Sequence, residues 1–160
     1  MEKATYILST VALNHYLGGD YSYILSRCQL FTTGIVAYSF CGQCRDVIIK
    51  EFSSTEMEDF LKFRSLNKNL TSVGFMDSSA IYYSSTSNAP LIVDDNKTEK
   101  VCKALDLKYI LFNNLCRNSK DLELIKASVN NSINLDRCGC GTLDSQSFAS
   151  VNNTIALMIG

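Results

Sequence analysis

The sequence predicts an α/β domain in three layers, with a mainly parallel central sheet covered by helices on both faces. Short apolar runs alternate along the chain with amphipathic segments, which is typical of parallel sheets covered by helices. The chain has 160 residues, of which 46% are hydrophobic and 19% charged. It is therefore long and apolar enough for one domain with its own core. We place this domain at residues 1–136, and we expect residues 137–160 to be a C-terminal extension that packs on it or extends it.

The first third of the chain is expected to begin with a strand and a helix. Residues 5–8 form a short apolar run, and apolar residues recur at helical spacing over residues 10–17, before a Gly-Gly pair ends the helix. A second short helix is expected at residues 21–27 and a strand at residues 30–32. The apolar run of residues 35–40 fits either a strand or a helix.

The middle of the chain is charged and amphipathic. Residues 45–65 predict two helices, which the polar residues 53–55 separate. Glu58 follows Thr55 at the spacing of a capping box. Residues 77–79 (Asp-Ser-Ser) precede an apolar run and are expected to cap the helix that follows.

The last third repeats the order of strand and helix. We expect strands at residues 91–93 and 108–111, and helices at residues 97–105 and 122–129. Parallel strands need such crossover helices between them. The pattern of this region is therefore the main reason to predict a parallel sheet.

Three acidic residues are expected to meet at one edge of this sheet. Asp94 and Asp95 directly follow the strand at residues 91–93, and Asp77 opens the preceding helix. Ligand sites of parallel sheets gather at the carboxyl ends of strands, and carboxylates there can hold Mg²⁺ or Mn²⁺. Such an ion can activate water against a phosphodiester. The structural alternative is that Asp77 caps a helix, while Asp94 and Asp95 begin the turn that caps the helix from Lys97.

Residues 76–110 (MDSSAIYYSSTSNAPLIVDDNKTEKVCKALDLKYI) resemble the carboxyl-terminal half of PIN domains. PIN domains are metal-dependent ribonucleases that include bacterial toxins of the VapC type. The shared pattern is an Asp that opens a helix, an apolar strand, a second Asp, and a helix that leads into another strand. The resemblance implies that Asp77 and Asp95 ligate Mg²⁺ or Mn²⁺, that Asp94 assists catalysis, and that the chain is an endoribonuclease. It also implies toxin–antitoxin pairing, with RNA and either a protein partner or a homodimer as binding partners.

The amino-terminal half resembles the family in topology but lacks two of its acids. Residues 6–17 and 31–40 are similar to the first strand and helix and to the second conserved segment. The family has an Asp at the position of Ser9, and a Glu at Ser39, or at Tyr38 with a one-residue slip. Divalent-ion affinity depends on ligand charge and number, so we expect a weakened or lost nuclease site.

The expected function is therefore that of a PIN-like protein that acts on RNA or binds it. Asp20 and Glu51 could substitute for the missing acids, although nothing in the sequence places either one at the site. A noncatalytic partner-binding module on the same scaffold is an alternative.

A CxxC motif supports a competing interpretation. Cys41 and Cys44 follow an apolar run and are expected to precede a helix that starts near Arg45. A thioredoxin-like thiol–disulfide oxidoreductase has this placement, because the helix N-terminus lowers the pKa of the first thiol. A zinc site that joins these two residues to Cys138 and Cys140 is a further alternative, although CxC is not the usual spacing. The plain alternative is that the cysteines are reduced and mostly buried.

Charge and cysteine content restrict the class of protein further. The 15 Lys and Arg residues nearly balance the 16 Asp and Glu residues, which excludes a general polyanion binder of the basic-arm type. A mild basic cluster does occur, and it consists of Lys97, Lys100, Lys103 and Lys108.

No apolar run reaches the roughly 18 residues that span a bilayer, so no membrane partner is expected. An odd number of cysteines, seven, favours a cytoplasmic location. His15, the single histidine, is expected to be a surface or core-edge residue rather than a catalyst.

Overall fold

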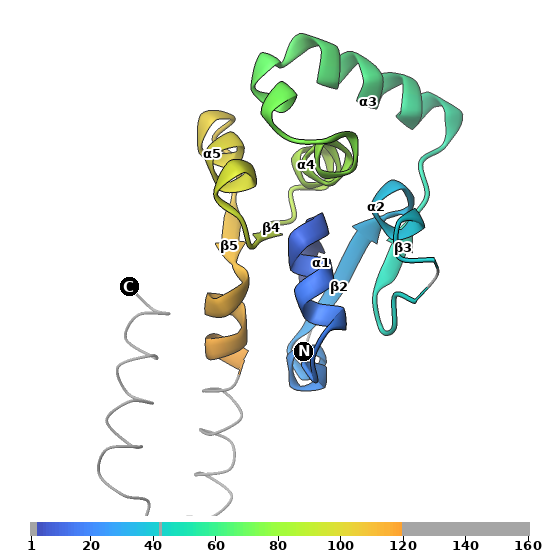
Figure 1. The fold of residues 1–160 in the computed structure, drawn as a ribbon. Coiled ribbons are helices and arrows are strands. Elements are labelled where there is room, and N and C mark those ends of the chain that lie inside the picture. Colours follow the sequence, from blue (N-terminus) through green and yellow to red (C-terminus); the bar gives the residue numbers. More distant parts are fainter. Residues whose placement is uncertain (1–2, 42, 120–160) are drawn as a thin grey trace, which may run out of the picture.

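The computed structural model describes residues 3–41 and 43–119, which contain a five-stranded parallel sheet (Figure 1). The strand order is β3-β2-β1-β4-β5. The strands are β1 (Ala4–Leu8), β2 (Cys28–Thr33), β3 (Ile48–Lys50), β4 (Leu91–Val93) and β5 (Tyr109–Leu111). This sheet confirms the predicted α/β class.

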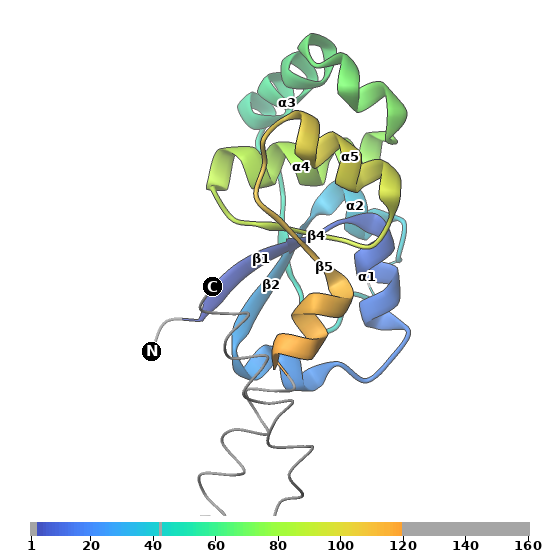
Figure 2. The same ribbon diagram turned by 90° about the vertical axis from the view of Figure 1, so that its left-hand side faces the viewer.

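Helices connect the strands and complete a three-layer arrangement. They are α1 (Thr10–Leu17), α2 (Gly34–Tyr38), α3 (Ser54–Leu66), α4 (Phe75–Ser87) and α5 (Asn96–Ala104), with two short 3₁₀ helices, η1 (Ser22–Ser26) and η2 (Lys68–Ser72). Connections between parallel strands are almost always right-handed. With this strand order, they place α1 and α2 over one face of the sheet and α3 to α5 over the other. In Figure 2, α3, α4 and α5 form one group at the top of the view.

The core is centred on the two middle strands of the sheet. Ile7 and Leu8 of β1 and Leu91, Ile92 and Val93 of β4 are all fully buried. Both faces of these strands are covered by helices, so consecutive residues are apolar instead of alternating with polar ones. This burial explains why the short runs at residues 5–8 and 91–93 predict their strands correctly.

The expectation of two helices in residues 45–65 is wrong. Residues Ile48–Lys50 form β3, and a single helix, α3, follows from Ser54. β3 pairs with β2 at the edge of the sheet, and its Ile48 and Ile49 remain partly exposed. A three-residue edge strand is too short to show the alternation that distinguishes a strand from a helix.

The capping box of α3 is also displaced from its expected position. Ser53 is the N-cap, and its Oγ accepts a hydrogen bond from the backbone N–H of Glu56 at 3.1 Å. The Glu56 carboxylate accepts in return from the backbone N–H of Ser53 at 3.1 Å. Two serines and one threonine stand in a row here, and the helix begins after the first of them instead of after Thr55.

Other expectations differ in detail. The segment at residues 21–27 forms the 3₁₀ helix η1, and the ambiguous run at residues 35–40 belongs mostly to α2. Residues 112–119 form a helix that the sequence did not predict. The expected helix at residues 122–129, the extension at residues 137–160, and Cys138 and Cys140 lie outside the described residues. Within residues 3–41 and 43–119, no helix is both long enough and apolar enough to cross a membrane.

Candidate functional site at the carboxyl edge of the sheet

The carboxyl ends of β1 and β4 bring the predicted site residues to one edge of the sheet. Ser9 follows β1, and Asp94 and Asp95 follow β4. The two strands are parallel neighbours, and the backbone N–H of Ser9 donates to the carbonyl oxygen of Ile92 at 3.1 Å. Helix α4 adds Asp77, whose Oδ1 lies 2.8 Å from the backbone nitrogen of the residue after Ser9. We call Ser9, Asp77, Asp94 and Asp95 the acidic edge.

Asp77 caps a helix other than its own. It was expected at the start of its helix, but α4 begins at Phe75, so Asp77 lies in the first turn. Its Oδ1 accepts from the backbone N–H of Thr10, the first residue of α1, and Ser9 makes no side-chain cap there. The first N–H groups of a helix lack partners within it, so Asp77 supplies an acceptor and a negative charge where both stabilise α1.

Asp95 has the capping role that was expected as the structural alternative. It is the N-cap of α5, and its Oδ2 accepts from the backbone N–H and from Oγ1 of Thr98, each at 3.1 Å. Its other oxygen, Oδ1, is buried and has no hydrogen-bond partner among the described residues. The thiol of Cys102 in α5 has a raised pKa of about 12. Burial is the main cause, and the negative charges of Asp95, Glu99 and Asp77 add to it.

Asp94 belongs to a hydrogen-bonded chain that the sequence did not predict. Its Oδ2 lies 2.8 Å from Nδ1 of His15, and Nε2 of His15 lies 2.9 Å from the hydroxyl of Tyr21. When Nδ1 carries the proton, Asp94 accepts from His15 and His15 accepts from Tyr21. The imidazole also packs on Phe112, with ring centroids 4.3 Å apart. The chain therefore ties α1, the end of β4 and the loop before η1 together, and His15 is a linking residue at the edge of the core.

The two serines at the positions of the missing acids differ in environment. Ser9 is fully buried, and its Oγ has no hydrogen-bond partner among the described residues. Ser39 is exposed at the carboxyl end of α2, where its Oγ donates to the carbonyl oxygen of Val36 at 2.8 Å. Thr33 is the residue that joins β2 to this region, because its Oγ1 is hydrogen-bonded to Oγ of Ser79 in α4 at 2.7 Å. Only Ser9 of the two serines therefore belongs to the acidic edge.

Glu51 is the remaining acid at the carboxyl end of a strand. It follows β3, and its carboxylate lies against the Cα of Gly34, where a side chain would collide with it. Gly34 follows β2 directly, so this carboxylate reaches from β3 to the neighbouring strand. Glu51 is exposed and follows β3, which is separated from β4 by two intervening strands, β2 and β1.

The donor set does not fit the metal centre that the resemblance implies. In the described part of the chain, no group of three or more His, Cys, Asp or Glu side chains is arranged to hold a metal ion. One oxygen each of Asp77, Asp94 and Asp95 already binds a protein group. Mg²⁺ demands octahedral oxygen coordination, usually with carboxylates free to take part. The second oxygens of Asp77 and Asp94 and the unpartnered Oδ1 of Asp95 are left, but within the described residues these side chains do not converge as a group around one ion.

The CxxC segment lacks the helix that a thioredoxin-like site requires. Cys41 is exposed, has a positive φ of 52° and follows α2, but the next element is the strand β3. The expectation of a helix from about Arg45 is therefore wrong. Among the described residues no helix begins beside Cys41, and burial raises the pKa of Cys44.

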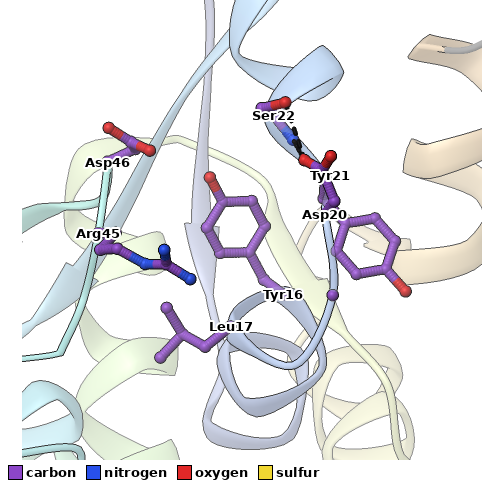
Figure 3. A pocket seen from close by; sticks show the side chains of 8 residues that line it. Tyr16, Leu17, Asp20, Tyr21, Ser22, Arg45 and Asp46 are labelled. Atoms are coloured by element: carbon purple, nitrogen blue, oxygen red, sulfur yellow. Dashed lines mark hydrogen bonds between the residues drawn. The ribbon is translucent and has the colours of Figure 1, made fainter.

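A pocket of about 170 Å³ lies beside the carboxyl end of α1 (Figure 3). The side chains of Tyr16 and Arg45 approach each other in it, and Asp20 and Asp46 flank them. Burial and the nearby Asp46 are the main causes that raise the pKa of Tyr16, while Arg45 acts in the opposite direction. Because two carboxylates accompany one guanidinium, the pocket has no net positive charge to attract a phosphate group.

Comparisons with known protein families, with curated proteins and with solved structures gave no match for this chain.

Proposed function

We propose that this chain is a PIN-like domain that binds RNA beside its acidic edge. Its nuclease site is lost, because the acidic residues of that site now stabilise the fold. The order of elements supports the first part of this proposal. An Asp in the first turn of α4, the buried strand β4, a second Asp, and α5 leading into β5 follow one another as the resemblance implies. The cytoplasmic location that the cysteines favour belongs to the same proposal.

The loss of the nuclease site is inferred from the hydrogen bonds of the acidic edge. Asp77 caps α1, Asp95 caps α5, and Asp94 binds His15. The three carboxylates are not grouped around one point among the described residues, so they would have to move to hold one ion. Such a movement would break these hydrogen bonds, and hydrogen bonds to charged groups contribute about 1.5–3 kcal/mol each. This commitment of all three carboxylates is the observation that carries the proposal.

RNA binding is inferred from the basic side of α5. Lys97, Lys100 and Lys103 are exposed on this helix, which starts at Asp95. Lys103 forms an ion pair with Glu99 at 3.1 Å, whereas Lys97 and Lys100 form none within the described residues. Unpaired lysines beside a strand-end edge are suited to phosphate oxygens. A protein partner or homodimer remains part of the proposal through the resemblance.

The test measures binding of a labelled single-stranded RNA pool in EDTA by fluorescence anisotropy. We compare the wild type with Lys97→Gln/Lys100→Gln, and with Lys3→Gln/Lys62→Gln as a control that removes the same charge from exposed positions before β1 and on α3. If each lysine contacts one phosphate, the first variant binds more weakly and its slope of log affinity against log salt becomes shallower by about 1.4, since each contact to a single strand contributes about 0.7. The control retains the wild-type slope.

Two results would contradict the proposal. If the wild type does not bind RNA, or if both variants lose RNA affinity equally, the RNA-binding site is not on α5. Cleavage of the RNA with Mn²⁺ that disappears in Asp95→Asn would show that the acidic edge is a working nuclease site.

A further inference from the structure

The outer surface of α3 carries a groove that the proposed function does not use. The groove has a volume of about 270 Å³ and lies between the last turns of α3 and η2. Its lining consists of Leu61, Arg64, Ser65, Lys68, Leu70 and Thr71. We call it the α3–η2 groove. The opposite side of α3 is held firmly, because Phe60 is fully buried and stacks with aromatic rings of α4 such as Tyr82.

An exposed apolar side chain lines this groove. Leu61 is 48% exposed, although it belongs to a helix whose other side packs on α4. Single exposed apolar residues are common, but one that lines a groove can bind an apolar side chain of a partner. The burial of such side chains against a partner is favourable, so this surface is suited to an apolar contact.

The charged side chains that line the groove are all positive. Arg64 and Lys68 line it, and no Asp or Glu does. Neither residue forms an ion pair with any described group. The guanidinium of Arg64 lies over the Phe75 ring, with Cζ 5.3 Å from the ring centroid. Its Nε is buried and has no hydrogen-bond partner among the described residues. A carboxylate in the groove would therefore meet the other N–H groups of this guanidinium, which form a fixed fork of donors.

We propose that the α3–η2 groove docks an acidic segment of a partner protein. A carboxylate of that segment pairs with Arg64, since guanidinium and carboxylate match in a two-pronged geometry, and Lys68 adds positive charge. A neighbouring apolar side chain of the segment lies in the groove against Leu61. Single-stranded RNA fits less well, because it needs open aromatic faces for its bases, and Arg64 already covers a face of Phe75.

The experiment uses the full chain and a fluorescein-labelled peptide in which Glu and Leu alternate. A matched peptide with Gln in place of Glu is the first control. We expect the acidic peptide to bind and the neutral one to bind at least tenfold more weakly, which is the effect of removing hydrogen bonds to charged groups. Arg64→Gln should lower the affinity for the acidic peptide by about tenfold or more. Leu61→Ser should also weaken binding of the acidic peptide, and Lys97→Gln should leave this binding unchanged. Circular dichroism confirms that each variant is folded.

Three results would overturn the inference. The first is an acidic peptide that fails to bind, or that binds equally to Arg64→Gln. The second is RNA affinity that falls in Arg64→Gln as it does in Lys97→Gln/Lys100→Gln, which would assign the groove to nucleic acid. The third is self-association in sedimentation that Leu61→Ser abolishes, which would make a second copy of the chain the occupant. None of these variants alters the acidic edge, so failure here leaves the proposed function standing.

Discussion

Replacement of Asp77 distinguishes a structural acid from a functional one. Its Oδ1 accepts a hydrogen bond from the Thr10 N–H at 2.8 Å across 67 positions of the chain, and the N-cap residue Ser9 makes no side-chain cap of its own. Asp77→Ala removes this acceptor, while Asp77→Asn keeps an oxygen at the same place and loses only the charge. We expect the alanine variant to be clearly less stable than the wild type and the asparagine variant to lie between them.

The magnitude follows from the contact that is lost. Removal of a helix cap costs about 0.5–2 kcal/mol, and loss of a hydrogen bond to a charged group costs about 1.5–3 kcal/mol. Helix α1 packs into the core through Ala12, Leu13 and Tyr16, so fraying of its first turn is coupled to the core. We therefore expect about 1.5–2 kcal/mol for Asp77→Ala and less than about 1 kcal/mol for Asp77→Asn. For a domain of this size, the first value lowers the melting temperature by roughly 5–10 °C.

The assay is urea unfolding at neutral pH, followed by circular dichroism. Asp59→Ala, an exposed acid on α3, is the matched control and should change stability by less than about 0.5 kcal/mol. The same proteins are then tested for RNA binding. If Asp77→Ala unfolds at the same urea concentration as the wild type but no longer binds RNA, the capping argument is refuted and Asp77 is a functional residue.

Two further predictions concern thiols and pH. Native thiol titration at pH 8 should modify the exposed Cys41 first and leave Cys28 and Cys102 unmodified, because burial raises their pKa values to about 11 and about 12; rapid reaction of all three would contradict this packing. Hydrogen bonds from the Ser53 backbone and from Lys50 lower the pKa of Glu56 below its ordinary 4.5. Its stabilising effect is therefore present above that value and is lost as pH falls through the lowered pKa. Urea unfolding should show Glu56→Gln less stable than the wild type at pH 7 but equal to it at strongly acidic pH, and a pH-independent difference would refute a stabilising role of the Glu56 charge.

Local patterns in the sequence predict the elements that their own residues determine. The helix at residues 10–17 and the strand at residues 91–93 match α1 and β4 in both bounds. Apolar spacing and buried apolar runs reflect the environment of each residue within one element, so they can be recognised without the rest of the fold. The strands adjacent to Asp94 and Asp95 were therefore predictable, and so was their place at an edge of the sheet.

The partners of the site residues depend on contacts between distant segments. Asp77 caps a helix 67 positions away, and Asp94 meets His15 through the pairing of β1 with β4. Nothing in the spacing of either residue along the chain records such a partner. The edge strand β3 was missed for a related reason, since three residues pair with β2 only because the sheet is already there. The sequence by itself determined the class of fold and the elements that carry the acids, whereas the tertiary structure decided which protein groups those acids bind. Hydrogen bonds between segments far apart in the chain form only once packing brings their ends together.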